Sequence, residues 1–151
     1  MNKLYKLLLL CLIAIATGGN ALKAAESITV TINNGTFVTL QDTDGDDYYE
    51  ISNADELFGF AQIVNSGNYD INAVLTSNIN LENRDWTTIC TTDLYYENTN
   101  YSNAVYTGTF NGQGYVISGM NITGSAENVT AGLFGAATDN NANNGTVIKN
   151  I

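Results

Sequence analysis

The stretch YTGTFNGQGYVISGMNI, residues 106–122, shows the pattern that decides the fold class. Two strand-like runs flank a turn signal, Asn111-Gly112-Gln113-Gly114, and Asn-Gly recurs at residues 34 and 144. The chain contains no proline, which is typical of strands that are paired on both sides and need every backbone N–H. Irregular coils of about 20–30 residues are typical of a β-solenoid. Four further apolar runs fit such coils: NAVLTSNINL (72–81), DWTTIC (85–90), AGLFG (131–135) and GTVIKNI (145–151).

Two other elements precede these runs. Residues 27–40, SITVTINNGTFVTL, alternate between apolar and polar side chains around Asn34-Gly35, which predicts a β-hairpin turn. Residues 52–67 predict a helix, with Ser52 as its N-cap, Asp55 close to completing a capping box and Gly67 at C′. Its expected buried face has helical spacing: Ala54, Leu57, Phe58, Ala61 and Val64.

The order of these pieces over residues 46–151, from YYEISNADELFGFAQIVNSG (48–67) to GTVIKNI, resembles the start of bacterial secreted proteins with the GLUG motif. The motif itself is Gly132-Leu133-Phe134-Gly135. The resemblance implies a right-handed parallel β-helix of the pectin-lyase-like type and a cell-surface, adhesin-like role. The chain departs from that pattern in having one copy of the motif, Cys90 where glycine is usual, and no separate enzymatic domain.

We therefore expect an all-β fold, a right-handed parallel β-helix (solenoid) with an N-terminal capping helix. The helix would cover the open edge of the first coil, and its alternative role is to recruit a partner. The sequence stops inside an apparent strand, so we expect the array to be truncated at Ile151. The expected organisation is a signal peptide (1–25), N-terminal strands and acidic loop (26–51), capping helix (52–67) and β-helix coils (68–151).

The N-terminus predicts export. Lys3 and Lys6 precede an apolar run over residues 7–16, and small residues follow it, so residues 1–25 have the pattern of a secretory signal peptide. The run is too short to span a membrane, and the mature chain is expected to be secreted or displayed at the cell surface without membrane insertion. Two alternatives remain open, a retained N-terminal anchor and lipidation at Cys11.

Composition excludes several classes of function. The chain has 22 Asn, 18 Thr and no histidine, so triads and imidazole metal sites are excluded. After cleavage, Arg84 and Lys149 stand against 15 acidic residues, a net charge of −13 that argues against nucleic-acid partners. Cys90 is the one mature cysteine, either a small buried hydrophobe or a reactive or intermolecular thiol.

An acidic run is the best candidate for a metal site. Ca²⁺ takes several oxygen ligands, and alternating aspartates around Gly45 can supply them. EF-hand spacing is excluded, because Gly45 falls at position four and Asn53 at position twelve. The alternative is a solvated acidic turn. The expected ligands of a possible Ca²⁺ cofactor are Asp42, Asp44, Asp46 and Asp47.

A tyrosine-rich segment, residues 93–106, is the expected ligand-facing surface. Aromatic rings among amides can stack on neutral sugars and are also typical of protein recognition. The alternative is that the rings cover the wall of the fold. The candidate ligand-binding residues are Tyr95, Tyr96, Tyr101 and Tyr106.

These observations predict a non-catalytic, secreted or surface-displayed scaffold for adhesion to a glycan or to a host or neighbouring-cell surface protein. No pair of carboxylates stands out for hydrolysis, and two mature cations are too few for lyases that bind acidic sugars. The alternatives are an N-terminal fragment of a larger β-helix polysaccharide-degrading enzyme, a fragment of a peptidase that carries GLUG repeats, and a segment whose loops bind nothing.

Overall fold

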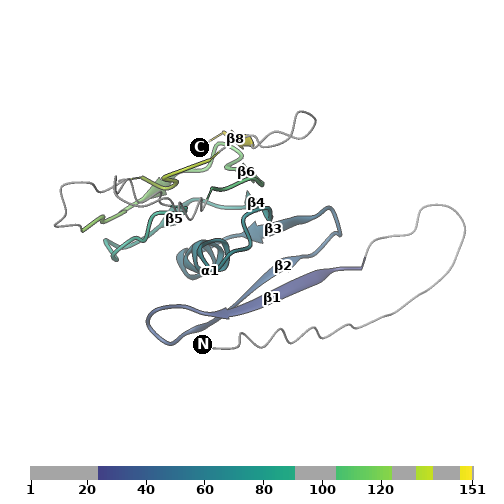
Figure 1. Ribbon diagram of the computed structural model, residues 1–151, viewed down its shortest axis with the longest axis horizontal. Helices are drawn as coiled ribbons and strands as arrows, with labels where there is room; N and C mark the ends of the chain where they lie inside the picture. Colours follow the sequence, from purple (N-terminus) through teal and green to yellow (C-terminus); the bar gives the residue numbers. More distant parts are fainter. Residues whose placement is uncertain (1–23, 91–104, 124–131, 138–146, 151) are drawn as a thin grey trace, which may run out of the picture.

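The computed structural model describes residues 24–90, 105–123, 132–137 and 147–150. In this part of the chain there are eight strands and one helix (Figure 1). The strands are β1 (Glu26–Thr31), β2 (Phe37–Asp42), β3 (Tyr48–Ile51), β4 (Asn72–Leu75), β5 (Ile79–Asn80), β6 (Thr109–Asn111), β7 (Ile117–Ser118) and β8 (Val147–Lys149), and the helix is α1 (Ala54–Asn65).

The strands form two sheets. The larger has six strands in the order β1-β2-β3-β4-β6-β8, and the smaller consists of β5 and β7. The pairs β1–β2 and β2–β3 are antiparallel, whereas β3–β4, β4–β6, β6–β8 and β5–β7 are parallel. Ala73 lies opposite Phe110 and Ile79 opposite Ile117, so residues 109–118 follow the same course as residues 72–80.

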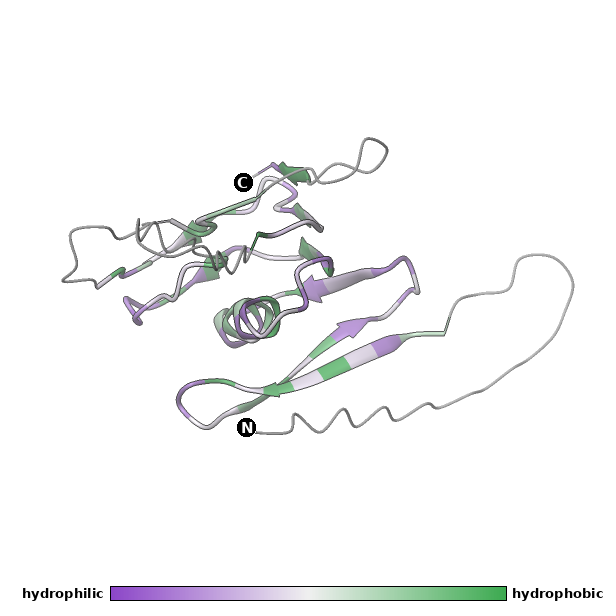
Figure 2. Ribbon diagram, viewed as in Figure 1, coloured by the Kyte–Doolittle hydropathy of each residue, from purple (hydrophilic) through white to green (hydrophobic). Residues whose placement is uncertain are grey.

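The predicted hairpin is present as β1 and β2. Its turn uses Gly35 at φ 85° and a bond from the Thr36 N–H to Asn34 Oδ1 at 2.9 Å. The alternation of hydropathy along β1 is visible in Figure 2. On β2 the inward positions are Val38 and Leu40, both buried, so one face of the hairpin joins the core.

Helix α1 begins one residue later than the sequence predicts. Its N-cap is Asn53, whose Oδ1 accepts a bond from the Glu56 N–H at 3.0 Å. The Glu56 carboxylate in turn accepts bonds from the Ser52 N–H at 2.7 Å and the Ser52 hydroxyl at 2.9 Å. Asn53 and Glu56 therefore take the roles predicted for Ser52 and Asp55, because Asn and Ser are equally good N-caps and Glu reaches further back.

The end of α1 confirms Gly67 at C′. Gly67 has φ 113°, and its N–H donates to Val64 O at 3.0 Å. The Asn68 N–H donates to Ile63 O at 3.4 Å, so the two bonds form a Schellman motif. The glycine is needed because this conformation is strained for residues with a Cβ.

Helix α1 lies inside the core, between the hairpin and the parallel strands (Figure 1). On the hairpin side, a Cβ at Gly59 would lie 3.0 Å from Val38 Cγ1, so glycine permits this close approach. On the other side, the ring of Phe60 lies 5.6 Å from that of Phe110 and 6.1 Å from that of Tyr106, measured between centroids. The helix therefore buries more than the predicted face, and the residues missed by the sequence pattern are Phe60 and Ile63.

The expected fold class is wrong. The described residues form a mixed six-stranded sheet and a two-stranded sheet around a 12-residue helix, in place of an all-β, right-handed parallel β-helix. The physical reason lies in the first half of the chain, where the Asn34-Gly35 turn makes an antiparallel hairpin that packs on α1. The helix is consequently a component of the core and not a cap ahead of the first coil.

Several predicted strands are shorter or absent. The run 72–81 is divided into β4 and β5, and the run 85–90 forms only single bridges, from Asp85 to Asn121 and from Ile89 to Phe134. The predicted signal peptide lies almost wholly outside the described residues, as do Cys11 and Ile151. Among the described helices, none has the length and apolar character needed to cross a membrane.

Candidate functional site

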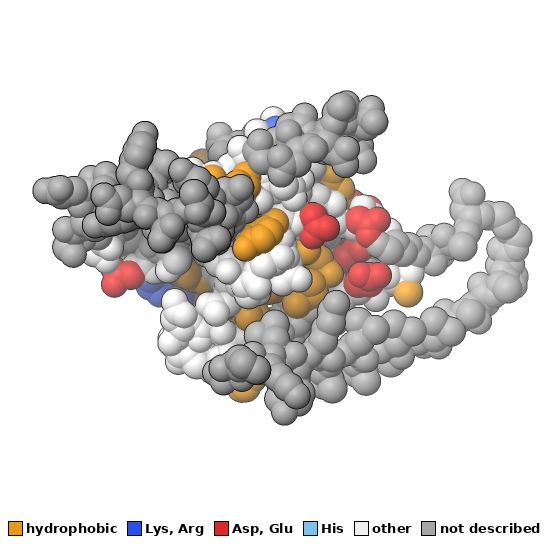
Figure 3. Space-filling view, in the orientation of Figure 1, with side chains coloured by type: hydrophobic (Ala, Val, Ile, Leu, Met, Phe, Trp, Pro, Cys, Tyr) orange, Lys and Arg blue, Asp and Glu red, His pale blue; other side chains and the backbone are white. Residues whose placement is uncertain are grey.

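The acidic loop joins β2 to β3, where acidic side chains gather on the surface at the right of the view in Figure 3. Asp42 is only 1% exposed, although it carries a carboxylate. Its Oδ1 accepts bonds from the N–H groups of Gly45 at 2.7 Å and Asp46 at 3.1 Å, and its Oδ2 accepts one from Asp47 at 3.1 Å. These three bonds offset the cost of burying the carboxylate and fix the course of the loop.

Three of the four predicted metal ligands come together. Carboxylate oxygens of Asp42, Asp44 and Asp46 lie within 4.8 Å of one another, whereas Asp47 takes part through its backbone N–H. Partial burial raises the pKa of Asp46, and the charge of Asp44 raises it further, while the bond from the Tyr48 N–H lowers it. Three carboxylates can supply part of the oxygen shell that Ca²⁺ requires, and the Ca²⁺ site stays a prediction.

The predicted tyrosine surface is only partly described. Tyr95, Tyr96 and Tyr101 lie outside the described residues. Tyr106 is 0% exposed, and its hydroxyl donates a hydrogen bond to Ile71 O at 2.8 Å. Its ring centroid lies 5.0 Å from that of Phe134, and burial strongly raises the pKa of its hydroxyl. Because a side chain without exposed surface cannot contact a ligand, the ligand-binding role predicted for Tyr106 is wrong, and the residue belongs to the core.

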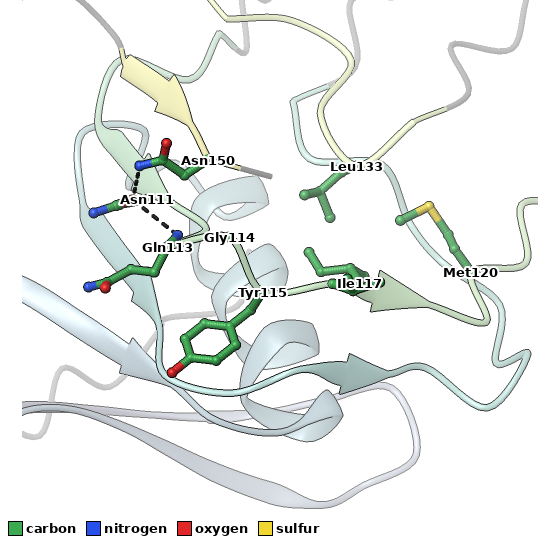
Figure 4. Close-up of a pocket in the computed structure, with 9 residues that line it drawn as sticks. Asn111, Gln113, Gly114, Tyr115, Ile117, Met120, Leu133 and Asn150 are labelled. Atoms are coloured by element: carbon green, nitrogen blue, oxygen red, sulfur yellow. Dashed lines mark hydrogen bonds between the residues drawn. The ribbon is translucent and has the colours of Figure 1, made fainter.

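A hollow of about 880 Å³ lies beside β7 and the end of β8 (Figure 4). One end of it carries amides, and the other end carries the apolar side chains of Ile117, Met120 and Leu133. Tyr115 lies between the two ends, with its hydroxyl directed away from the apolar end. The nine described residues that line it include no carboxylate, lysine or arginine: they are Asn111, Gln113, Gly114, Tyr115, Val116, Ile117, Met120, Leu133 and Asn150.

The amide end of the hollow is held together by its own hydrogen bonds. Asn150 Nδ2 donates to Asn111 Oδ1 at 3.1 Å, and the same oxygen accepts a bond from the Gln113 N–H at 3.1 Å. The Gly114 N–H donates to Asn150 O at 2.8 Å, which joins the chain after β8 to the 112–115 turn. The side-chain amide of Gln113 and the hydroxyl of Tyr115 have no partner among the described residues, so both are available to a ligand.

The sequence pattern did not single out this hollow. Its polar members come from the Asn111-Gly112-Gln113-Gly114 turn, which the sequence identifies only as a turn. The sequence did contain one signal for it, the tyrosine Tyr115 that directly follows this turn. An aromatic ring beside the amides of an Asn-Gly turn has the same binding chemistry as the tyrosines predicted to bind a ligand in residues 93–106. The approach of Asn150 to Asn111 depends on the pairing of β8 with β6, which the local sequence does not specify.

Arg84 and Cys90 both contact helix α1. Arg84 Nη1 lies 2.6 Å from Asp55 Oδ1, and the Arg84 guanidinium carbon lies 4.5 Å from the centroid of the Phe58 ring. Cys90 is buried, and burial raises the pKa of its thiol to about 11. Its backbone N–H donates to Oδ1 of Asn65, the last residue of α1, at 2.8 Å. At neutral pH the thiol is therefore protonated and shielded, and the structure favours the buried-hydrophobe interpretation of Cys90.

No family model matches the chain, and no curated protein or solved structure matches it either.

Proposed function

We propose that this chain is a non-catalytic, exported binding module that recognises its partner through the hollow beside β7. The observation that carries this function is the chemistry of the hollow, where free amide and phenol groups lie beside a half-buried apolar wall and none of the nine described lining residues is charged. In a mature chain with a net charge of −13, an uncharged concave surface favours a neutral partner.

The same lining supports binding over catalysis. General acid–base and nucleophilic chemistry need an ionisable or activated group within hydrogen-bond reach of the substrate. The ionisable group of the hollow is Tyr115, which has no base among the lining residues to activate it. Amides, a phenol and aliphatic carbons are instead the groups that orient and cover a bound neutral molecule.

The resemblance to GLUG-motif proteins adds the expectation of a surface-exposed, adhesive role. Gly132-Leu133-Phe134-Gly135 carries that resemblance, and Leu133 is one of the apolar lining residues. Residues 1–25 have the pattern of a signal peptide, which supports export. The partner class at this level is a neutral glycan or a surface protein.

The function is tested by binding of the purified mature chain to arrays of neutral glycans and extracellular-matrix proteins. Gln113→Ala removes an exposed amide from the hollow, and Gln41→Ala removes an exposed amide from β2 as the matched control. We expect Gln113→Ala to weaken binding by about fivefold to tenfold and Gln41→Ala to leave it unchanged. Equal effects of the two substitutions, or no binding to any array member, would contradict this function.

A further inference from the structure

The β1–β2 hairpin is an uncharged part of a strongly acidic chain. Residues 27–41 contain no Asp, Glu, Lys or Arg, whereas the mature chain has a net charge of −13. The acidic residues that flank the hairpin, Glu26 and Asp42, lie opposite each other at the end remote from the turn. Two copies of such a chain repel each other, and the repulsion is smallest where they meet at a surface remote from carboxylates.

Phe37 projects from this hairpin into solvent. Its side chain is 79% exposed, the largest value for a bulky apolar residue in the described part of the chain. Val38, the next residue of β2, is buried beside Gly59 of α1, so Phe37 lies on the opposite, outer face of the hairpin. Single exposed apolar residues are common on protein surfaces, so Phe37 becomes informative only together with a complementary site.

A cavity of about 270 Å³ lies at the turn end of the same hairpin, on the side of α1. Its floor is apolar, with Ile32 and Ala61 buried and Phe58 half-buried. Its rim consists of exposed amides and hydroxyls without a charged side chain, so it suits an uncharged, apolar occupant. The described residues that line this hairpin pocket are Ile32, Asn33, Phe58, Ala61, Gln62, Asn65, Ser66 and Thr87.

A phenylalanine ring matches the hairpin pocket in size and polarity. An apolar cavity of about 150 Å³ already holds benzene, so one of about 270 Å³ has room for a benzyl group. Phe37 does not reach the pocket of its own chain, because it lies on the outer face of the hairpin and Ile32 on the inner face. The pairing of Thr31 with Phe37 in the β1–β2 ladder fixes this orientation. The chain therefore carries a ring and a pocket that a second copy can bring together and a single copy cannot.

We propose that the chain associates with itself head to tail, with Phe37 of one copy seated in the hairpin pocket of the next. A second copy is favoured as the occupant because ring and pocket belong to one chain, are both uncharged, and are kept apart within it. Since they lie on opposite faces of the hairpin, the contact is heterologous and extends into rows or rings of copies. A contact of this size is weak, and we expect a Kd of about 10–100 μM.

The hairpin pocket shares no residue with the hollow beside β7. Self-association therefore goes beyond the proposed function and is tested separately from it. A row of copies would present several hollows to one surface, which raises the avidity of binding without any new contact to the ligand.

Analytical ultracentrifugation of the mature chain over a concentration series measures the association. Phe37→Ser removes the ring, and Val147→Ser removes a 39% exposed apolar side chain from β8 as the matched control. We expect Phe37→Ser to weaken association at least tenfold and Val147→Ser to leave it unchanged. Higher salt should strengthen association of the unaltered chain, because it screens the repulsion between two acidic copies.

A mixing experiment tests the head-to-tail arrangement. Ala61→Leu fills the pocket from α1, whereas Phe37→Ser keeps the pocket open but lacks the ring. We expect each variant alone to be monomeric and an equimolar mixture to form dimers and nothing larger, because one copy supplies the ring and the other supplies the pocket. If the melting temperature of Ala61→Leu shows that it does not fold, Gln62→Glu takes its place and puts a carboxylate at the exposed rim of the pocket.

Three outcomes would overturn self-association through Phe37. The first is an unaltered chain that stays monomeric at about 1 mM, well above the expected Kd, which includes the case of a pocket filled by the chain's own residues. The second is association of Phe37→Ser as strong as that of the unaltered chain, which places the contact elsewhere on the molecule. The third is a mixture that stays monomeric although both of its variants are folded.

Discussion

The chain runs along the same course twice, in residues 72–80 (the first pass) and residues 109–118 (the second pass), and two isoleucines in register are buried to different extents. Ile79 in β5 and Ile117 in β7 lie opposite each other in a parallel ladder. Ile79 is 1% exposed, whereas Ile117 is half-buried and lines the hollow. The two residues have the same side chain, and among the described residues β5 and β7 each pair only with the other, so strand pairing does not account for their different burial. At this pair of positions the first pass lies in the core, whereas the second borders the hollow.

The largest expected effect follows directly from this difference. Ile79→Ala removes a fully packed side chain and should reduce the free energy of unfolding by about 2–5 kcal/mol. Ile117→Ala removes one that water already reaches, and should cost about 1 kcal/mol. Urea denaturation of the two variants measures both values. Equal losses would mean that the second pass is packed as completely as the first.

Two glycines at the start and in the turn of the second pass compare a crowded backbone position with an open one. A Cβ at Gly108 would lie 2.3 Å from Ile71 O, which is backbone and cannot move aside easily. Gly114 has φ 81° but no atom within 4 Å of an added Cβ. We expect Gly108→Ala to destabilise the fold by about 3 kcal/mol and Gly114→Ala by about 1 kcal/mol, the cost of the left-handed conformation. Melting temperatures that fall equally would show that the approach of residue 108 to Ile71 is not tight.

The buried thiol of Cys90 allows burial after the first pass to be tested by pH. Burial raises the pKa of Cys90 from 9.0 to about 11, so the folded chain keeps a proton that the unfolded chain loses in this range. The stability contributed by the neutral thiol is complete below pH 9 and is lost as the pH rises to about 11, by roughly 2 kcal/mol. The measurement is the free energy of unfolding against pH, compared with Cys90→Ala.

The Cys90→Ala control is needed because burial also raises the pKa values of Tyr49 and Tyr106, so ionisation of these tyrosines at high pH lowers stability as well. Both variants contain these tyrosines, so the difference between their pH profiles isolates Cys90. Parallel profiles from pH 8 to 11 would show that the thiol is open to solvent.

The smallest effect is expected at the acidic loop, on the surface beside the first pass. The raised pKa of Asp46 means that its charged form is disfavoured in the fold, so this contribution to stability is complete below the unfolded pKa of 3.8 and is lost as the pH rises through the raised pKa of the folded state. Ca²⁺ should reverse this loss, and we expect 5 mM Ca²⁺ to raise the melting temperature by roughly 2–4 °C. Asp44→Asn should remove this response and, without Ca²⁺, stabilise the loop slightly.

Mg²⁺ at the same concentration is the control for non-specific screening, since it prefers a tighter octahedral shell. A melting temperature that Ca²⁺ does not change would contradict the metal prediction and leave the acidic run as a solvated turn.

Local signals in the sequence predict local structure well. The Asn34-Gly35 hairpin and the Schellman glycine Gly67 depend on neighbouring residues, and both are present in the structure. The start of the helix is displaced by one residue because Ser52 and Asn53 are both good N-caps. Phe60 was missed because one-face periodicity assumes a helix with one buried side, whereas α1 is covered on two.

Long-range pairing accounts for what the sequence did not predict. The hollow depends on the contact between Asn150 and Asn111, which are 39 residues apart, and Tyr106 is buried because its hydroxyl reaches Ile71, 35 residues earlier. No local pattern distinguishes a tyrosine with such a partner from one that faces solvent. The Asp cluster could be predicted from the local sequence because its carboxylates bond N–H groups only two to five residues away.

These separations also determine the order in which the molecule can fold. Hairpin partners such as Thr29 and Thr39 are 10 residues apart, whereas Asn78 and Val116 are 38 residues apart. Closing the longer loop costs more entropy, so the later pass gains contacts only when a template already exists. The hairpin and α1, which meet at Gly59, supply that template from the first half of the chain. We therefore expect the N-terminal half to form first and the later strands to pair onto it.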